Sequence, residues 1–296
     1  MSAMRPRGLA RIVLVVLVLF GLCTGGYVLY DRGRAAPLPT KEELYEGVTY
    51  RRLVRYLPRP MIAHVLTIDR RVKGIEFLVT PPDDEGARPL KARTTSQFLR
   101  EFGVQIAING DNFEPWWSRS PADYYPHDGD PVSPFGFAAS SGKVYSIDDL
   151  EEVGVRPTLY INRRNVLSFN DRPNRVHHAI SGERMIVLKG NVAPDLDPGG
   201  PEPRTALGLN RNGRYVYIVV VDGRQPFYSE GATFVELAEI LIEQGAFMAM
   251  ALDGGGSSTL VVEGEDGSPR ILNSPIDHLI PGTERPVGNH LGIYVK

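Results

Sequence analysis

The chain is poor in cysteine and has no excess of charge of either sign. Among its 296 residues there is one cysteine, Cys23. A single cysteine excludes an intrachain disulfide framework and a cysteine-based zinc site. The 33 Lys and Arg residues nearly balance the 35 Asp and Glu residues, so the formal net charge is −2. This balance excludes a polybasic nucleic-acid binder and a disordered acidic chain.

What the chain does contain is typical of a globular domain rich in strands. Hydrophobic residues make up 42% of the sequence and charged residues 23%, which supplies enough apolar surface for a sizeable core. The 31 glycines and 24 prolines exceed what a helical bundle tolerates and indicate many turns. We therefore expect an α+β or mixed α/β fold, with one strand-rich domain that contains a mixed sheet and a few helices.

One long apolar run stands near the N-terminus. Residues 12–30 contain no charged side chain, and this length crosses the bilayer core as a helix. Arg5, Arg7 and Arg11 precede the run and favour a cytoplasmic segment over residues 1–11. We expect a retained transmembrane anchor, a linker over residues 31–45 and an extracytoplasmic domain over residues 46–296. A cleaved signal peptide is the alternative, although no A-x-A cleavage site follows the run.

Two segments of the domain have the pattern of a strand that follows or precedes a helix. A short helix over residues 96–102, capped by Thr94 or Thr95 and ended by Gly103, precedes a buried strand over residues 104–108. Further on, a strand over residues 215–221 is followed by a helix with Thr233 as N-cap and Glu236 at the third helical position. This helix ends before Gly245, and a second strand covers residues 247–252. A crossover of this length makes the two strands parallel.

Polar residues follow three of these strands. Asp222 comes directly after the strand at 215–221, and Asp253 comes after the strand at 247–252. Parallel strands bring both carboxylates to the same edge of a sheet, where open α/β sheets bind ligands. Asn109, Gly110 and Asp111 follow the strand at 104–108 in the same way. We therefore expect the three polar strand ends to converge on one site.

The residues around Asp253 and in one long loop suggest what this site binds. The string DGGGSS over residues 253–258 offers successive backbone N–H groups to an anion, and it lacks the lysine of a P-loop. Arginine binds two phosphate oxygens at once, which makes Arg204 and Arg224 candidate phosphate ligands. Residues 114–134 form a proline-rich loop, in which Trp116 suits a sugar face. His127 in that loop suits a metal, acid–base or loop-ordering role.

The order of these motifs resembles the phosphodiester glycosidase family. The resemblance lies in RTALG at 204–208, VDGRQP at 221–226, the capped helix and LDGGGSST at 252–259. AING at 107–110 with Phe113, and ERPVGN at 284–289, extend it over roughly residues 60–296. The sequence departs from the family pattern at Asp111 and Asn112, where the family often shows glycine and an aromatic residue. The departure adds a carboxylate and an amide near the site.

The resemblance implies hydrolysis of a sugar-1-phosphodiester at the anomeric carbon, which releases free sugar and a phosphomonoester. The candidate nucleophile or base is Asp253, Asp222 or Asp111, and the stereochemistry stays open between retention and inversion. The candidate phosphate ligands are Arg204, Arg224 and Arg285. The other candidate substrate-binding residues are Asn109, Gly110, Gly254, Gly255, Gly256, Ser257, Ser258, Glu284, Asn289, His127 and Trp116.

Two other classes of function remain open at this point. In a metal-dependent phosphodiesterase, Asp111, Asp222, Asp253 and His127 would bind Ca²⁺ or Mg²⁺, the one type of cofactor that the sequence leaves open. In a non-catalytic envelope module, the arginines and tryptophans would bind anionic glycans. The expected partners are a carbohydrate phosphodiester and, through the N-terminal helix, a membrane, but no nucleic acid.

Overall fold

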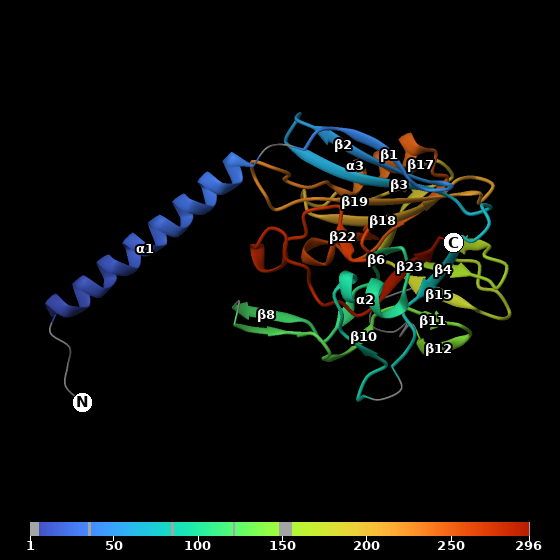
Figure 1. Ribbon diagram of the computed structural model, residues 1–296, viewed down its shortest axis with the longest axis horizontal. Helices are drawn as coiled ribbons and strands as arrows, with labels where there is room; N and C mark the ends of the chain where they lie inside the picture. Colours follow the sequence, from blue (N-terminus) through green and yellow to red (C-terminus); the bar gives the residue numbers. More distant parts are fainter. Residues whose placement is uncertain (1–5, 35–36, 84–85, 121, 148–155, 296) are drawn as a thin grey trace.

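The computed structural model describes residues 6–34, 37–83, 86–120, 122–147 and 156–295 (Figure 1). Helix α1 (Pro6–Gly33) projects from a strand-rich body, and its 20-residue apolar window from Arg11 to Tyr30 is not buried by the rest of the protein. The helix is longer than the predicted span over residues 12–30. Residues 1–5 of the predicted cytoplasmic segment lie outside the described residues.

Within the described residues, three sheets and two small β-ribbons form the body. The largest sheet has eight strands in the spatial order β1 (Thr40–Tyr45), β2 (Val48–Arg55), β3 (Met61–Asp69), β19 (Tyr215–Val221), β18 (Arg204–Leu209), β20 (Met248–Ala251), β16 (Arg184–Leu188) and β17 (Asn191–Val192). The second sheet has the order β22 (Pro269–Ile271), β21 (Leu260–Glu263), β6 (Ile106–Asn109), β23 (His290–Tyr294) and β4 (Glu76–Val79). The third has the order β12 (Lys143–Ser146), β11 (Ala138–Ser140), β15 (His178–Ser181), β13 (Thr158–Ile161) and β14 (Leu167–Phe169). The ribbons are β5 (Leu90–Lys91), β10 (Pro131–Pro134) and β7 (Phe113–Glu114), and β8 (Trp117–Ser120) with β9 (Asp123–Tyr125).

The expected mixed sheet is wrong in its strand directions. Every ladder between the strands of the described residues is antiparallel. β19 and β20 are parallel to each other, as the crossover helix predicts, but both pair with β18, which lies between them. The helical crossover from β19 to β20 passes over β18. The two parallel strands are therefore not neighbours and form no ladder with each other.

Both predicted helices are confirmed together with their caps. In α2 (Thr95–Phe102) the Thr94 side chain accepts a hydrogen bond from the Gln97 backbone, and Gly103 ends the helix with a left-handed φ of 64°. In α3 (Phe234–Gln244) Thr233 and Glu236 form a reciprocal capping box. These local interactions need no tertiary partner, which is why the sequence alone predicts them.

The core lies in two layers on either side of the largest sheet. Alternate residues of β19 enter different layers, because side chains of a strand point to opposite faces. Val216, Ile218 and Val220 pack between the largest sheet and the other two sheets. Tyr217, Val219 and Val221 pack beneath α3 on the other face. Because both faces of β19 are covered by other elements, its sequence is a continuous hydrophobic run. In a similar way, α2 packs on the outer face of the second sheet.

Two segments differ from the expected connections. Residues 40–45, assigned from the sequence to the linker, form the edge strand β1, which buries none of its side chains and therefore shows no apolar periodicity. The predicted loop over residues 114–134 contains the β8–β9 ribbon and β10. All three strands are short. β8 and β9 bury none of their side chains, whereas β10 buries Val132 and Pro134, so tertiary pairing and not a long hydrophobic pattern defines these strands.

Candidate active site

A cleft of about 680 Å³ opens where β18, β19 and β20 meet the loop after β6. Its walls come from seven separate segments of the chain. The lining residues are Asn112, Phe113, Glu114, Pro115, Trp116, Phe135, Glu183, Glu202, Arg204, Arg224, Asp253, Gly254, Gly255 and Arg285.

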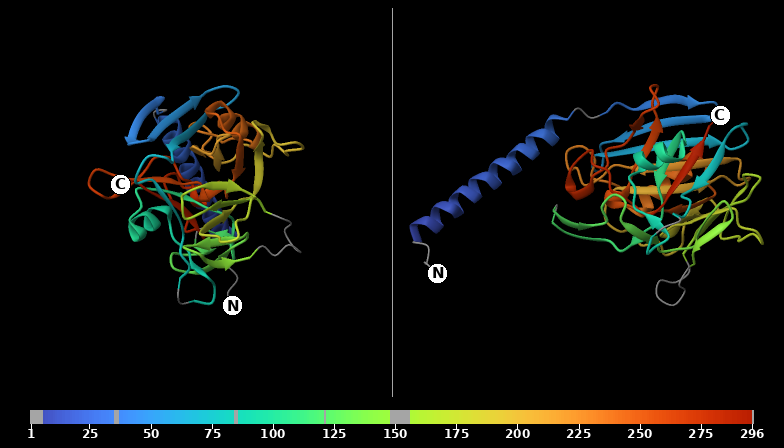
Figure 2. Two further views of the ribbon diagram at one scale, coloured as in Figure 1. Left: turned by 90° about the vertical axis from the view of Figure 1, so that its right-hand side faces the viewer. Right: turned by 60° about the horizontal axis from the view of Figure 1, so that its bottom comes forward.

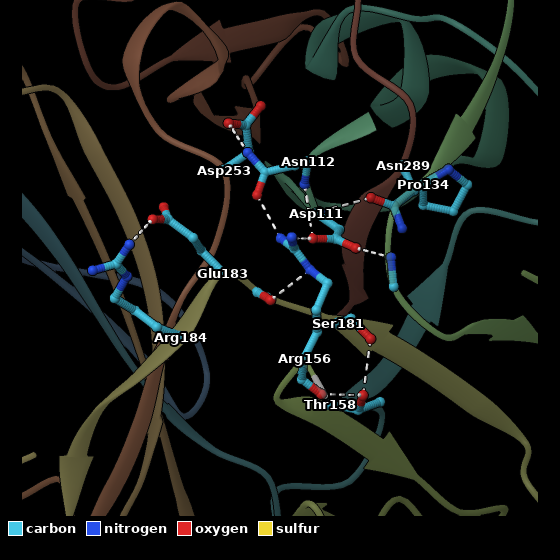
Figure 3. Close-up of polar contacts among 12 residues, drawn as sticks. Asp111, Asn112, Pro134, Arg156, Thr158, Ser181, Glu183, Arg184, Asp253 and Asn289 are labelled. Carbon is cyan, nitrogen blue, oxygen red and sulfur yellow. Dashed lines mark hydrogen bonds and ion pairs between the residues drawn. The ribbon is translucent and has the colours of Figure 1, made fainter. Parts of the chain in front are cut away.

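Asp253 lies in the cleft at the end of β20 and is held by the chain that follows β6. Its backbone N–H donates to Gly110 O at 3.0 Å, and Asn109 Nδ2 donates to its backbone carbonyl at 2.7 Å. Asn112 Nδ2 donates to its Oδ1 at 2.7 Å, close to the Arg156 side chain (Figure 3). The predicted meeting of these two strand ends is therefore confirmed, and it fixes the position of the Asp253 carboxylate.

The surroundings of Asp253 change its acidity. Burial raises the pKa of the Asp253 carboxyl to about 6, while a hydrogen bond from Ser257 and the positive charge of Arg285 lower it. The negative charge of Asp111 acts in the same direction as burial. A carboxyl group with a pKa near 6 changes its protonation state close to neutral pH, as a general base or acid requires.

Asp111 sits behind the cleft in a buried ion pair. Its Oδ1 lies 2.8 Å from Arg156 Nη2, and its Oδ2 accepts a hydrogen bond from the Gly136 backbone at 2.7 Å (Figure 3). Burial raises the pKa of Asp111, and the Arg156 charge opposes that shift. Arg156 Nη2 also donates to Asn112 Oδ1 at 2.5 Å, so the pair orients the amide that touches Asp253. Sequence reasoning missed Arg156, because it belongs to no motif.

The three predicted phosphate arginines all line the cleft. Arg204 donates to the carbonyls of Ala232 and Gly200 and lies 3.8 Å from the centre of the Phe234 ring. Carboxylates hold the other two: Arg224 Nε lies 2.5 Å from Glu202, and Arg285 Nε lies 2.7 Å from Asp277. Each guanidinium is thus anchored on one side before any ligand enters, which lowers the entropy cost of binding an anion.

The glycines after Asp253 are required by this close packing. A Cβ atom at Gly256 would lie 2.4 Å from Arg285 Nη2, and Gly255 has a φ of 60°. Ser257 Oγ accepts a hydrogen bond from Arg285 Nη1 at 3.4 Å. Gly254 and Gly255 line the cleft, whereas the buried Ser258 hydroxyl has no hydrogen-bond partner among the described residues. The 3₁₀ turn over Gly255–Ser257 therefore brings backbone close to the cleft arginines.

Asp222 does not line the cleft. It is fully buried, its Oδ2 lies 3.1 Å from His64 Nε2, and its Oδ1 accepts a hydrogen bond from the Ser274 backbone at 2.6 Å. His64 in turn contacts the Tyr50 hydroxyl at 2.8 Å. The end of β19 reaches the cleft through Arg224 instead, so the expected convergence of three carboxylates is wrong for Asp222.

The remaining candidates lie outside the cleft, with one exception. Asn289 Oδ1 accepts from the Asp111 backbone, and Glu284 Oε1 accepts from the Ser96 backbone at the start of α2. His127 is exposed and lies 3.3 Å from Asp130. Gly110 and Asn109 support Asp253 from behind. Trp116 is the exception: it lines the cleft, is half exposed, and lies 5.1 Å from the Arg285 guanidinium.

Three glutamates of the cleft were not predicted. Glu114 belongs to β7 and lies 3.0 Å from Arg88. Glu183 follows β15 and lies 2.7 Å from Arg184, and Glu202 precedes β18 and holds Arg224 (Figure 3 shows the first pair). Glu202 lies two residues before the RTALG motif, which is the one signal that could have drawn attention to it. Within the described ranges, no three His, Cys, Asp or Glu side chains gather as a metal-binding group. The four proposed metal ligands are therefore not brought together.

Comparison with known proteins decides the family. The family model of phosphodiester glycosidases matches residues 102–294. The chain belongs to the phosphodiester glycosidase family. Two curated members are N-acetylglucosamine-1-phosphodiester alpha-N-acetylglucosaminidases: the Bos taurus enzyme is 39% identical over 221 residues, and the Homo sapiens enzyme 26% over 252. The matches cover 68% and 78% of this chain but 38% and 45% of those proteins, so it spans less than half of either relative.

Solved structures share the fold of this chain. The catalytic domain of the zebrafish N-acetylglucosamine-1-phosphodiester alpha-N-acetylglucosaminidase, auto-inhibited by its pro-peptide, has a TM-score of 0.61 at 19% identity. That match covers 90% of this chain and 86% of the zebrafish chain. A hypothetical protein from Synechocystis has a TM-score of 0.58 at 15% identity, covering 88% and 64%. At these identities the likeness concerns the fold alone.

Proposed function

We propose that this protein hydrolyses a sugar-1-phosphodiester at the anomeric carbon and releases free sugar and a phosphomonoester. The observation that carries the proposal is the placement of the Asp253 carboxylate in one cleft with Arg204, Arg224 and Arg285. Family membership supports the same reaction class. The proposed substrates are envelope or extracellular glycans, and the support for this is the apolar helix α1, which the basic residues Arg5, Arg7 and Arg11 precede or begin.

Two groups of residues in the cleft have different roles in the proposed reaction. The arginines bind the phosphate oxygens and stabilise the charge of the departing phosphomonoester. The backbone N–H groups expected to bind an anion do not take part, because those of Gly255, Ser257 and Ser258 donate to carbonyls of the chain itself. Asp253 acts at the anomeric carbon as nucleophile or base. The bond from the anomeric carbon to the phosphate oxygen breaks, its electron pair leaves with the phosphate, and water supplies the new hydroxyl. A phosphomonoester is a good leaving group, so a strong general acid is not required.

The test is to follow the bond that breaks. The full-length protein in detergent is incubated with sugar-1-phosphodiesters, including UDP-N-acetylglucosamine, in ¹⁸O-labelled water, with and without chelator. Carbon and phosphorus NMR should show free sugar, a phosphomonoester and no ¹⁸O in the phosphate. The first anomer detected assigns retention or inversion. Sugar-1-phosphate with labelled phosphate, lost on adding chelator, would instead support a metal-dependent phosphodiesterase that uses Ca²⁺ or Mg²⁺.

The pH dependence of the reaction should report the ionisation of Asp253. As a nucleophile or base it must be ionised, so kcat/KM should fall as the pH drops below about 6. Replacing Ser257 with Ala removes a hydrogen bond that favours the ionised form, and should move this acid limb upward by about one pH unit. Ser258→Ala, which removes a neighbouring hydroxyl without a partner, is the matched control and should leave the limb in place. If the acid limb of Ser257→Ala stays in place, the limb does not report the ionisation of Asp253.

A further inference from the structure

Helix α1 is long and apolar enough to cross a membrane beside the body. Its apolar window of 20 residues has a length of about 30 Å at 1.5 Å per residue, which matches the hydrocarbon core of a bilayer. The window ends at Tyr30 and the helix at Gly33. Arg34 follows directly, and its backbone N–H still donates to Tyr30 O at 3.1 Å. Arg34 therefore lies within about 6 Å, or four residues, of the apolar span.

Arg34 is docked on the segment that carries the cleft residue Arg224. Its Nη2 donates to Ser274 Oγ at 3.0 Å, its Nη1 donates to Gln225 Oε1, and its guanidinium lies 3.6 Å from the centre of the Tyr228 ring. Gln225 is the next residue after Arg224. These contacts attach the end of α1 to the body at a fixed point. A bilayer that surrounds α1 would therefore lie near the cleft.

Large apolar side chains are exposed around this attachment point. Phe227 is 45% exposed, Leu279 62%, Ile280 52% and Trp116 50%. Phe227 lies 4.6 Å from the Arg32 guanidinium at the end of α1. We call these four residues the apolar rim. Exposed apolar groups that cluster beside a binding cleft mark an interaction surface.

The backbone holds Leu279 and Ile280 outward. They lie on the loop between Ser274, which contacts Arg34, and Arg285, which lines the cleft. Leu279 has a φ of 62°, in the left-handed region that residues other than glycine rarely adopt. The Ile280 N–H donates to Asp277 O at 2.9 Å, and Asp277 is the partner of Arg285. The turn that exposes the two apolar residues is thus built on the ion pair that anchors a cleft arginine.

The β8–β9 ribbon extends the same face with residues typical of a membrane interface. Ser118 Oγ lies 3.4 Å from His278 Nδ1, and the Tyr124 and His278 rings are 4.3 Å apart, so the ribbon packs on the Leu279 loop. Trp117 stacks on Tyr125. Tryptophan and tyrosine are enriched at the level of lipid head groups. Figures 1 and 2 agree that this ribbon extends from the end of the body that faces α1.

We infer that the cleft opens against the bilayer that holds α1, and that its substrate is a sugar phosphodiester whose second alcohol is a membrane lipid. The apolar rim and the β8–β9 ribbon rest in the head-group region, while the cleft arginines bind the phosphate. The surface that contacts the apolar rim is assigned to the bilayer, because α1 brings the bilayer within a few residues of the rim. The inference rests on the proposed function for the reaction, and on the rim and the Arg34 contacts for the substrate class.

Membrane contact can be measured without any substrate. The chain has two tryptophans, Trp116 and Trp117, and both belong to this face. The full-length protein is reconstituted into phosphatidylcholine vesicles in which lipids carry bromine near the head group. The inference requires that the bromolipid quenches tryptophan fluorescence and that Leu279→Asp combined with Ile280→Asp lowers this quenching. Val166→Asp, on the turn between β13 and β14, is the matched control at an exposed apolar position and should change nothing.

Substrate class is tested with two diesters of the same sugar phosphate, one with a short soluble alcohol and one with a long-chain lipid alcohol. The lipid diester should be hydrolysed about tenfold faster when it shares vesicles with the protein than in separate vesicles, because a shared surface raises its effective concentration. The double Asp variant should lose about fivefold of that rate and keep its rate on the soluble diester. If shared vesicles give no faster hydrolysis of the lipid diester, or if tryptophan fluorescence is not quenched, the inference is overturned. Hydrolysis of the soluble diester would in that case still uphold the proposed function. Hydrolysis of neither diester overturns the proposed function and the assigned substrate class, whatever the quenching shows.

Discussion

Asp253→Asn is expected to lower kcat by about 10³-fold or more, since removing a group that attacks or deprotonates at the reacting carbon costs about two to four orders of magnitude. The amide keeps the shape of the side chain and still accepts the hydrogen bond from Asn112. It cannot act as nucleophile or base. KM should change much less than kcat, because the cleft arginines remain. Steady-state kinetics on a sugar-1-phosphodiester measure both values.

The same substitution should make the protein more stable at neutral pH. The folded pKa of about 6 exceeds the ordinary value of 3.8, so folding disfavours the ionised carboxylate. Between pH 4 and 6 the unfolded chain loses this proton first, and wild-type stability falls as the pH rises. The full cost at pH 7 is about 3 kcal/mol, at 1.36 kcal/mol for each unit of pKa. Asp253→Asn should therefore raise the free energy of unfolding by about 1–3 kcal/mol at pH 7 and by almost nothing below pH 4.

Asp222→Asn is the matched control for this prediction. Asp222 also follows a strand of the largest sheet, but its carboxylate is buried against His64 and Ser274. We expect lower stability and a nearly unchanged kcat per folded molecule. A folded Asp253→Asn protein with near-normal kcat, or a greater loss of kcat in Asp222→Asn, would remove Asp253 from the centre of the mechanism.

Arg156→Leu is expected to destabilise the fold by about 3–5 kcal/mol, the typical cost of removing one partner of a buried ion pair. The Asp111 carboxylate is 1% exposed and would lose its counter-charge, keeping only backbone donors from Asn112 and Gly136 for its oxygens. Its pKa, already raised by burial, would rise further. The loss of stability caused by Arg156→Leu should therefore become smaller as the pH is lowered. Urea unfolding at several pH values measures the effect.

A second substitution separates the ion pair from simple packing. Asp111→Asn in the Arg156→Leu background removes the unpaired charge and should restore most of the lost stability, so the coupling energy in the double-mutant cycle should be at least about 2 kcal/mol. An Arg156→Leu protein that loses less than about 1 kcal/mol would show that the pair is not important for the fold. Because Arg156 also orients Asn112, kcat should fall in the single variant even where the protein is fully folded.

Local chemistry explains which parts of this fold were predictable. The N-caps at Thr94 and Thr233 and the glycines that end both helices act over a few residues. The parallel orientation of β19 and β20 followed from the helix between them. Strand β1 and the β8–β9 ribbon were missed, since short exposed strands have no hydrophobic pattern and exist because of their pairing partners.

By itself the sequence determined the family, the apolar helix and the cleft residues that lie in motifs, namely Asp253, the glycines after it and the three arginines. Tertiary structure alone decided which carboxylate faces the cleft. Asp222 and Asp253 occupy equivalent positions after parallel strands, but His64 and Ser274 enclose the first, and Asn112 and Arg285 surround the second. Only the fold could also show Arg156 beneath the site and Arg34 beside it. The physical reason is that a carboxylate's ionisation and reach depend on neighbours distant in sequence, whereas caps, turns and apolar runs depend on neighbours along the chain.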